Sequence, residues 1–196
     1  MKRLIAALAA SVFVVSGCGS AGSSGSAGGH DGHGMAGPSS TASGHNAADV
    51  MFAKMMIPHH RQAVEMAELA DGTAGPQVTK LAAAIKKAQG PEITEMSGWL
   101  KAWGEPVPSD GGTEHGMSHG DGMMSDADMK KLRGMSGAAF DRMFLTMMIK
   151  HHQGAVAMAK TERAGGAYPA AKSLASSIIT TQNAEIAKMR TMLTSG

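Results

Sequence analysis

The chain has a single cysteine and few aromatic residues: four Phe, two Trp and one Tyr among 196 residues. A single cysteine has no partner for a disulfide within the chain. The sequence also contains no combination of residues typical of a hydrolytic enzyme with a nucleophilic side chain. The formal net charge of +2 falls to 0 when Lys2 and Arg3 are left out. A near-neutral chain without a basic surface predicts no nucleic-acid partner.

Residues 1–18 have the pattern of an export signal. Lys2 and Arg3 precede an apolar stretch, Leu4 to Val15, that is too short to span a bilayer. Val15-Ser16-Gly17-Cys18 resembles the lipobox of bacterial lipoproteins. The resemblance implies cleavage before Cys18 and acylation of Cys18, which would hold the protein on the outer face of the cell membrane. A plain secretory signal with an incidental cysteine is the alternative.

Two stretches rich in Gly, Ser and Ala, residues 19–46 and 104–125, are predicted to be flexible. Both also contain His and Met: His30, His33, Met35 and His45 in the first, and His115, Met117, His119, Met123 and Met124 in the second. Such side chains either collect metal ions weakly or are ordinary low-complexity filler.

Methionine is abundant, with 18 residues, and much of it lies in a sequence repeat. Residues 49–60 read DVMFAKMMIPHH, and residues 141–152 read DRMFLTMMIKHH. A second match, at an offset of 93 residues, relates residues 81–100 to residues 174–193. Apolar packing alone does not require an imidazole pair to recur beside thioethers, whereas imidazole and thioether both bind soft or borderline transition metals. The chain therefore reads as a repeated helical unit that binds metal.

Each repeat predicts two helices joined by a glycine-rich turn. Pro76 and Pro169 lie where proline opens a helix, Ser125 and Asp128 form a capping-box pattern before a further short helix, and Pro91 is expected to kink or restart its helix. We predict an all-α fold, a four-helix bundle built from two tandem αα-hairpins, residues 47–103 and 126–194, which form one domain over residues 47–194. No segment has a strand pattern.

A helical wheel at about 100° per residue places the unusual side chains. His59 and His151 fall at the centre of the apolar stripe of each first helix. His60 and His152 fall at its edge, where hydrogen bonds at helix–helix seams are an alternative to metal binding. The repeat suggests a pseudo-two-fold axis, so equivalent residues are expected to approach each other across the bundle. Glu92 and Glu185 lie within the apolar stripes of the second helices, together with Gln89 and Gln182. A carboxylate in an apolar face is costly unless it is paired, protonated or bound to metal.

A metal-free interpretation stays open. Single histidines and methionines on apolar stripes are commonly core residues, and Glu92 accepting a hydrogen bond from His59 would need no ion. The recurrence of His, Glu and Met together in both repeats favours the metal-binding interpretation.

The same residues resemble a known family. Met-Met-Ile-x-His-His-x-x-Ala-Val-x-Met-Ala occurs in both repeats and is followed by Gln-x-x-Glu-Ile-x-x-Met, and residues 122–129 and 140–145 add further matching sequence. Over about residues 46–194 this pattern is similar to the bacterial domain-of-unknown-function family 305. The resemblance implies a ferritin-like bundle, exported or lipid-anchored, with similarity to copper-binding and copper-resistance proteins.

Ligand chemistry favours copper among the candidate ions. Ferritin-like di-iron sites need Glu-x-x-His, but the second helices here carry Gln-x-x-Glu. Zinc gains little from thioethers, whereas Cu(I) suits both Met and His. Glu92 and Glu185 would ligate Cu(II) or orient the imidazoles. The predicted ligands are His59 and His151, Met55 and Met147, Met66 and Met158, Glu92 and Glu185, Met96 and Met189, and the edge residues His60 and His152.

Three functions are compatible with this pattern. The first is a lipid-anchored copper-binding protein that sequesters or delivers the ion, with a copper-handling protein as partner. The second is a metal-dependent oxidoreductase, and the third is a metal-free interaction module of the cell envelope. The sequence does not decide whether the protein is an enzyme.

Overall fold

The computed structural model describes residues 44–109 and 122–195. Cys18, His30, His33, Met35, His115, Met117 and His119 lie outside these ranges. The described part contains five helices and no strand: α1 (Ala47–Glu68), α2 (Pro76–Ala102), α3 (Asp126–Arg133), α4 (Gly137–Gly165) and α5 (Pro169–Ser195). The all-α prediction is confirmed. None of these helices is long and apolar enough to cross a bilayer.

The helices begin where local chemistry favours a start. Pro76 and Pro169 are the first residues of α2 and α5. The predicted capping box is confirmed at α3, where Ser125 Oγ accepts the Asp128 N–H at 3.1 Å and the Asp128 carboxylate accepts from the Ser125 backbone. A second capping box, Asn46 with Asp49, starts α1 and was not anticipated.

Of the two outcomes expected at Pro91, the restart is wrong, and the kink stays a prediction. Helix α2 continues from Pro76 to Ala102 with Pro91 inside it, and α1 likewise contains Pro58. Proline removes one backbone donor and crowds the preceding turn. Tertiary packing along both flanks of the proline outweighs that cost, because Ile85 and Met96 are both fully buried.

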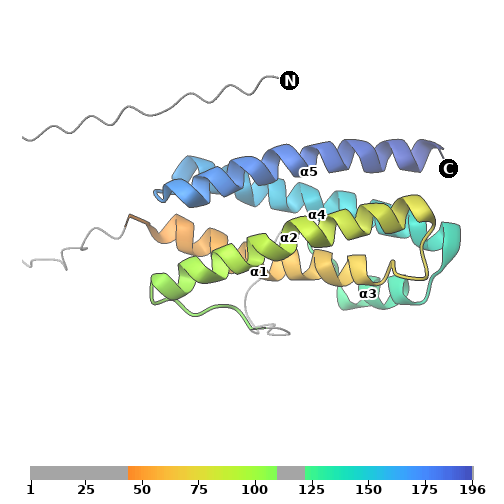
Figure 1. The fold of residues 1–196 in the computed structure, drawn as a ribbon, viewed down its shortest axis with the longest axis horizontal. Coiled ribbons are helices and arrows are strands. Elements are labelled where there is room, and N and C mark those ends of the chain that lie inside the picture. The colour runs from red at the N-terminus through yellow and green to blue at the C-terminus, as the bar shows by residue number, and fades with distance from the viewer. Residues whose placement is uncertain (1–43, 110–121, 196) are drawn as a thin grey trace, which may run out of the picture. The chain divides into compact units, whose positions relative to one another are not determined.

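Four long helices form the bundle, as predicted, and pack as two hairpins. Helix α1 packs on α2, α4 packs on α5, and the two hairpins meet through α1 and α4 (Figure 1). The short helix α3 lies against α4 near the turn between α1 and α2. The first helices of the two repeats therefore face each other, which brings the repeated motifs together.

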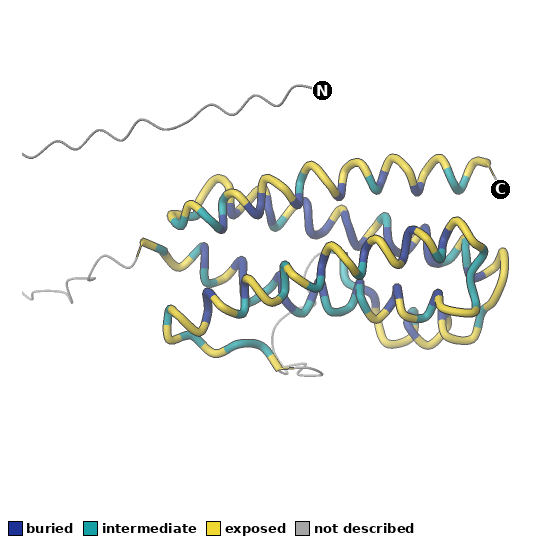
Figure 2. The backbone as a smooth tube through the Cα atoms, viewed as in Figure 1, coloured by how far each residue is buried: buried dark blue, intermediate teal, exposed yellow. Residues whose placement is uncertain are grey.

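Buried segments recur along the four long helices (Figure 2), and the buried apolar residues form two clusters. The proximal cluster lies towards residue 44 and includes Phe52, Met56, Ile57, Met96, Leu100, Ala155, Leu174 and Ile178. The distal cluster lies towards the other end and includes Met66, Leu81, Ile85, Phe140, Phe144, Met147, Met148 and Met189. Each fully buried large apolar side chain contributes roughly 1.5–3 kcal/mol to folding. Between the clusters, every long helix contributes polar residues.

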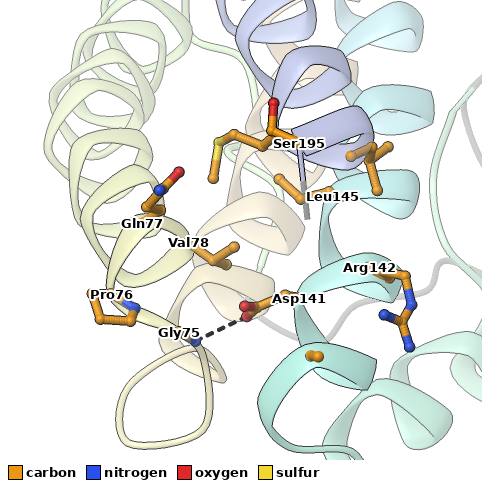
Figure 3. A pocket seen from close by; sticks show the side chains of 11 residues that line it. Gly75, Pro76, Gln77, Val78, Asp141, Arg142, Leu145 and Ser195 are labelled. Atoms are coloured by element: carbon orange, nitrogen blue, oxygen red, sulfur yellow. Dashed lines mark hydrogen bonds between the residues drawn. The ribbon is translucent and has the colours of Figure 1, made fainter.

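Each repeat is fastened to the other through an aspartate at the start of its first helix. Asp141 of α4 accepts the Gly75 N–H at 3.0 Å, in the turn before α2 (Figure 3). A shallow pocket lies beside this contact, lined by Val78 and Leu145 among others. At the opposite end, Asp49 of α1 accepts the N–H groups of Ala167 and Tyr168 in the turn before α5, at 3.1 and 2.9 Å.

The segments predicted to be flexible make defined contacts where they are described. The His45 ring stacks on Trp103, with ring centroids 4.3 Å apart. Arg61 of α1 donates to the Pro108 carbonyl at 2.6 Å. The next residue, Gln62, pairs with both the N–H and the carbonyl of Met124, at 2.7 and 2.9 Å. Bundle contacts thus extend beyond the helices on both sides of residues 110–121.

Candidate functional site

A layer of polar residues crosses the middle of the bundle between the two apolar clusters. We call it the histidine layer, and it consists of His59 and His60 from α1, Gln89 and Glu92 from α2, His151 and His152 from α4, and Gln182 and Glu185 from α5. All four histidines are buried, with 0–1% of their surface exposed. Four buried imidazoles in one layer are unusual, because a polar group removed from water needs a compensating partner.

The two central histidines meet at the contact between the hairpins. The ring centroids of His59 and His151 are 3.7 Å apart, and the ring planes are inclined by 38°. Within the described residues, no side chain hydrogen-bonds to the ring nitrogens of His151, and the only backbone group that influences the ring by a hydrogen bond is that of His59. The sequence-predicted convergence of these two rings is therefore present, and it leaves buried acceptor or donor capacity at the centre of the bundle.

The flanking histidines pair with the carboxylates of the second helices. His60 Nε2 lies 2.7 Å from Glu92 Oε2, and His152 Nε2 lies 2.7 Å from Glu185 Oε2. The carboxylates are partly exposed, 19% for Glu92 and 24% for Glu185, while both imidazole side chains are at 0%. Each pair is thus open to water only from the carboxylate side.

The hydrogen bonds of His60 and His152 to the neighbouring helices agree with the expectation for the edge histidines, but the burial of these residues differs from the wheel-based expectation. His60 and His152 were expected at the edge of the apolar stripe, but the second helix of each hairpin covers that edge and buries them. For the same reason Glu92 bonds to His60 rather than to His59. A wheel describes one helix in isolation, and the neighbouring helix decides which edge is covered.

Other atoms of the histidine layer are also buried without a hydrogen-bond partner in the described part. The Nδ1 atoms of His60 and His152 are buried and have no hydrogen-bond partner in the described part. The side-chain oxygens of Gln89 and Gln182 are in the same state, and these residues are only 3% exposed. Buried polar atoms without partners are uncommon in folded proteins and indicate a missing ligand, ion or water.

The electrostatic surroundings keep the centre of the layer neutral. Burial, and after it the nearby imidazoles of His59, His152 and His60, holds the pKa of His151 well below its usual value of 6.5. Burial disfavours the charged form, and a second positive ring nearby would disfavour it further. His151 therefore keeps a free lone pair at neutral pH, which is the form that binds metal.

The methionines predicted as ligands differ in how far they are buried. Met66, Met96 and Met189 are completely buried and Met147 is 7% exposed. Met55 and Met158 are half-buried. Met66, Met147 and Met189 belong to the distal cluster, and Met96 belongs to the proximal cluster, with Met158 packed against it. Met51, on the same predicted stripe, is 54% exposed and lies outside the layer.

His, Cys, Asp and Glu side chains alone do not form a complete metal site in the described part of the chain. Across residues 44–109 and 122–195, no group of three or more His, Cys, Asp and Glu side chains is arranged to hold one ion. An ion at the layer would need thioether or water ligands in addition to imidazoles. Thioethers are available on both sides of the layer, and they are soft ligands.

One buried acidic residue escaped the sequence analysis. Glu162 of α4 is only 1% exposed and lies close to Asp49 of α1. The signal was present, because Glu162 follows His151 by 11 residues, or about 20° around the helix. The matching position in the first repeat is Ala70, so Glu162 is not among the residues that the two repeats share.

The fold and this layer define a four-helix bundle protein with a histidine-rich centre. Residues 49–193 match the family described as Domain of unknown function (DUF305). The chain belongs to this family, as the sequence motifs predicted.

Solved structures of related proteins share the fold. A DUF305 protein of Streptomyces coelicolor, provisionally described as secreted, is 35% identical, with a TM-score of 0.69 over 76% of this chain and 93% of that chain. A DUF305 fragment from Deinococcus radiodurans is 32% identical, with a TM-score of 0.69 over 77% and 98%. CopM in its Cu(I)-bound form is 34% identical, with a TM-score of 0.63 over 75% and 96%. CopM structures also exist in Cu(II)-bound, silver-bound and apo forms. A search of curated proteins finds no match to this chain.

Proposed function

We propose that this protein binds copper at the histidine layer and sequesters or delivers the ion outside the cytoplasm. The observation that carries the proposal is the meeting of the buried His59 and His151 rings, whose centroids lie 3.7 Å apart. No side chain of the described part hydrogen-bonds to the His151 ring there. A buried imidazole costs folding free energy unless something binds it, and a copper ion would use that capacity.

The carboxylates have a positioning role in this proposal. Glu92 accepts a hydrogen bond from His60 Nε2, and Glu185 accepts one from His152 Nε2. A neutral imidazole that donates from Nε2 carries its lone pair on Nδ1, and both Nδ1 atoms are buried without partners in the described part. A carboxylate that fixes the tautomer and orientation of a metal-binding histidine is a recurrent feature of metal sites.

Copper is preferred to zinc or iron because of the donor set. His59, His151, His60 and His152 supply imidazoles, while Met55, Met147, Met66, Met158, Met96 and Met189 are the candidate thioethers. Soft thioethers select Cu(I), and they remain ligands at any pH because they need no deprotonation. The Cu(I), Cu(II) and silver complexes of CopM support the proposal for a related chain.

Export and anchoring complete the proposal. The signal pattern of residues 1–18 and the lipobox cysteine Cys18 favour acylation at the outer face of the cell membrane. The provisional description of the Streptomyces coelicolor relative as secreted agrees with export. A copper-handling protein would then receive the ion, and the His and Met residues of the two Gly-rich stretches would capture it.

Competitive Cu(I) titration against a chromogenic chelator tests the site. We expect tight binding by the wild type and a loss of at least 100-fold in affinity for His59→Ala combined with His151→Ala. The matched control is Gln153→Ala, which removes an exposed polar residue next to His152 and leaves the layer intact.

Two outcomes would overturn the proposal. Binding that the double variant leaves unchanged would place copper elsewhere, and an absence of binding by the wild type would favour the metal-free module. Sustained multiple-turnover oxidation of an added reductant by the copper-loaded protein would instead indicate an oxidoreductase.

A further inference from the structure

A pair of carboxyl groups at the proximal end of the bundle plays no part in the histidine layer. Asp49 of α1 is 0% exposed and Glu162 of α4 is 1% exposed. Both approach Gly166, where a side chain would collide with Glu162 Oε1 and Asp49 Oδ1. Two buried carboxyl groups therefore face one small space at the junction of α1, α4 and the turn before α5.

Asp49 is held in its charged form by backbone donors. It accepts the N–H of Asn46 at 2.6 Å, the N–H of Ala167 at 3.1 Å and the N–H of Tyr168 at 2.9 Å. Burial pushes the pKa of Asp49 up, but these hydrogen bonds outweigh burial and hold the pKa below its usual value of 3.8. A carboxylate with several N–H donors resists protonation.

Glu162 has the opposite surroundings. Neither of its oxygens accepts a hydrogen bond from an N–H or O–H group in the described part. Burial first, and then the adjacent Asp49, raises the pKa of Glu162 to about 7, with Lys172 of α5 acting against the rise. A buried carboxyl group beside a charged carboxylate is most stable when it is protonated and donates a hydrogen bond to that neighbour.

We propose that Asp49 and Glu162 share one proton and form a pH-operated clasp between the start of α1 and the turn before α5. With the proton present, the clasp joins the two elements. Loss of the proton leaves two negative charges in one buried space, and the start of α1 then separates from the turn. Lys172 compensates the second charge only in part, because burial and the adjacent Asp49 outweigh its effect on Glu162, and its Nζ donates to the Gly166 carbonyl at 3.2 Å.

The clasp controls how the chain enters the bundle. Asn46 Nδ2 donates to the Gly165 carbonyl at 2.8 Å, and His45 stacks on Trp103. Trp103 in turn packs edge-on against Tyr168, with ring centroids 5.3 Å apart. Opening the clasp therefore loosens His45 and Asn46, through which the N-terminal segment reaches the bundle, and it changes the surroundings of Trp103.

Intrinsic fluorescence reports on the clasp, because Trp99 and Trp103 are the two tryptophans of the chain and both contact Tyr168. In the full chain without added copper, we expect a fluorescence transition with a midpoint near pH 7. Glu162→Gln, which cannot ionise, should remove this transition. His45→Phe excludes the imidazole that stacks on Trp103 as the titrating group and should leave the transition in place.

Hydrogen exchange at the Ala167 and Tyr168 amides provides an independent measurement. Above pH 7 their protection should fall in the wild type by about tenfold more than in Glu162→Gln, beyond the general base-catalysed increase. Identical pH profiles of fluorescence and exchange for wild type and Glu162→Gln would overturn the clasp, as would loss of the transition in His45→Phe alone. These outcomes do not depend on whether copper binds.

Discussion

Asp49 and Asp141 occupy the same position in the sequence repeat, yet they fasten the two ends of the bundle differently. Asp141 accepts one N–H, from Gly75, whereas Asp49 accepts N–H groups from Asn46, Ala167 and Tyr168. Only Asp49 faces a second carboxyl group, because the residue that matches Glu162 is Ala70 in the other repeat. The aspartate that accepts N–H groups from the other repeat is thus present at both ends of the bundle, whereas a titratable partner is present only beside Asp49.

The middle of the bundle shows the opposite pattern. The His60–Glu92 and His152–Glu185 distances are equal at 2.7 Å, and Gln89 and Gln182 are equally exposed at 3%. Matching geometry in the layer, beside divergent ends, indicates that the central residues serve one shared purpose while each end serves its own. The predictions below test this contrast, from the largest expected effect to the smallest.

Asp49→Ala should destabilise the protein by about 3 kcal/mol or more, because each buried N–H that loses its acceptor costs about 1–3 kcal/mol. Asp141→Ala, which leaves only the Gly75 N–H without an acceptor, should lower the free energy of unfolding by about 1–3 kcal/mol. Urea unfolding at pH 6 measures both. Equal costs would mean that the two ends are fastened alike.

The stability of the wild type relative to Glu162→Gln should fall as pH rises. The pKa of Glu162 is about 7 in the folded protein, against 4.5 in the unfolded chain. Between these pH values the folded protein binds a proton that the unfolded chain has lost, so the free energy of unfolding falls as the pH rises. The relative loss from pH 4.5 to pH 8 should be roughly 3.5 kcal/mol at most, because the two pKa values differ by about 2.5 units at about 1.4 kcal/mol per unit. Parallel stability–pH curves would contradict this origin.

Glu92→Gln and Glu185→Gln should weaken copper binding by similar factors, about 10- to 100-fold each. An amide no longer selects one imidazole tautomer, because it offers both a donor and an acceptor. Chelator competition measures the affinity, and nitrogen-15 NMR of the apo protein measures the tautomers of His60 and His152. A large effect from one variant only would show that the layer is functionally one-sided.

Disruption of surface ion pairs should have the smallest effect. Lys54 and Glu105 pair at 2.6 Å with about a third of each side chain exposed, and Glu105→Gln should cost about 0–1 kcal/mol. Thermal unfolding at low and high salt checks this, since added salt should reduce the difference between the two proteins.

Structural features that arise from local sequence or from the repeat were predictable from the sequence. Pro76, Pro169 and the Ser125–Asp128 capping box define helix starts by chemistry that acts within one turn. The meeting of His59 with His151 followed from the repeat, because matched residues on matched helices approach each other across a two-helix contact.

Other residues depended on neighbours that a single helix does not reveal. The burial of His60 and His152 is set by α2 and α5, which cover the edge of each stripe. The environment of Glu162 is set by Asp49, which is distant in sequence and belongs to the other hairpin. Continuity of α2 through Pro91 reflects core contacts on both sides of the proline, which local propensity does not include.

Arg61 and Gln62 bond to Pro108 and Met124, so the chain leaves and rejoins the bundle at adjacent positions of one helix. When the two ends of a connection are fixed close together, doubling its length costs only about 0.6 kcal/mol of closure entropy. The interval between residues 110 and 121 is therefore a practical insertion point for a fluorescent or affinity module. Such a fusion would attach a reporter near Arg61 and Gln62, which follow His59 and His60 of the histidine layer in α1, while leaving both termini unmodified.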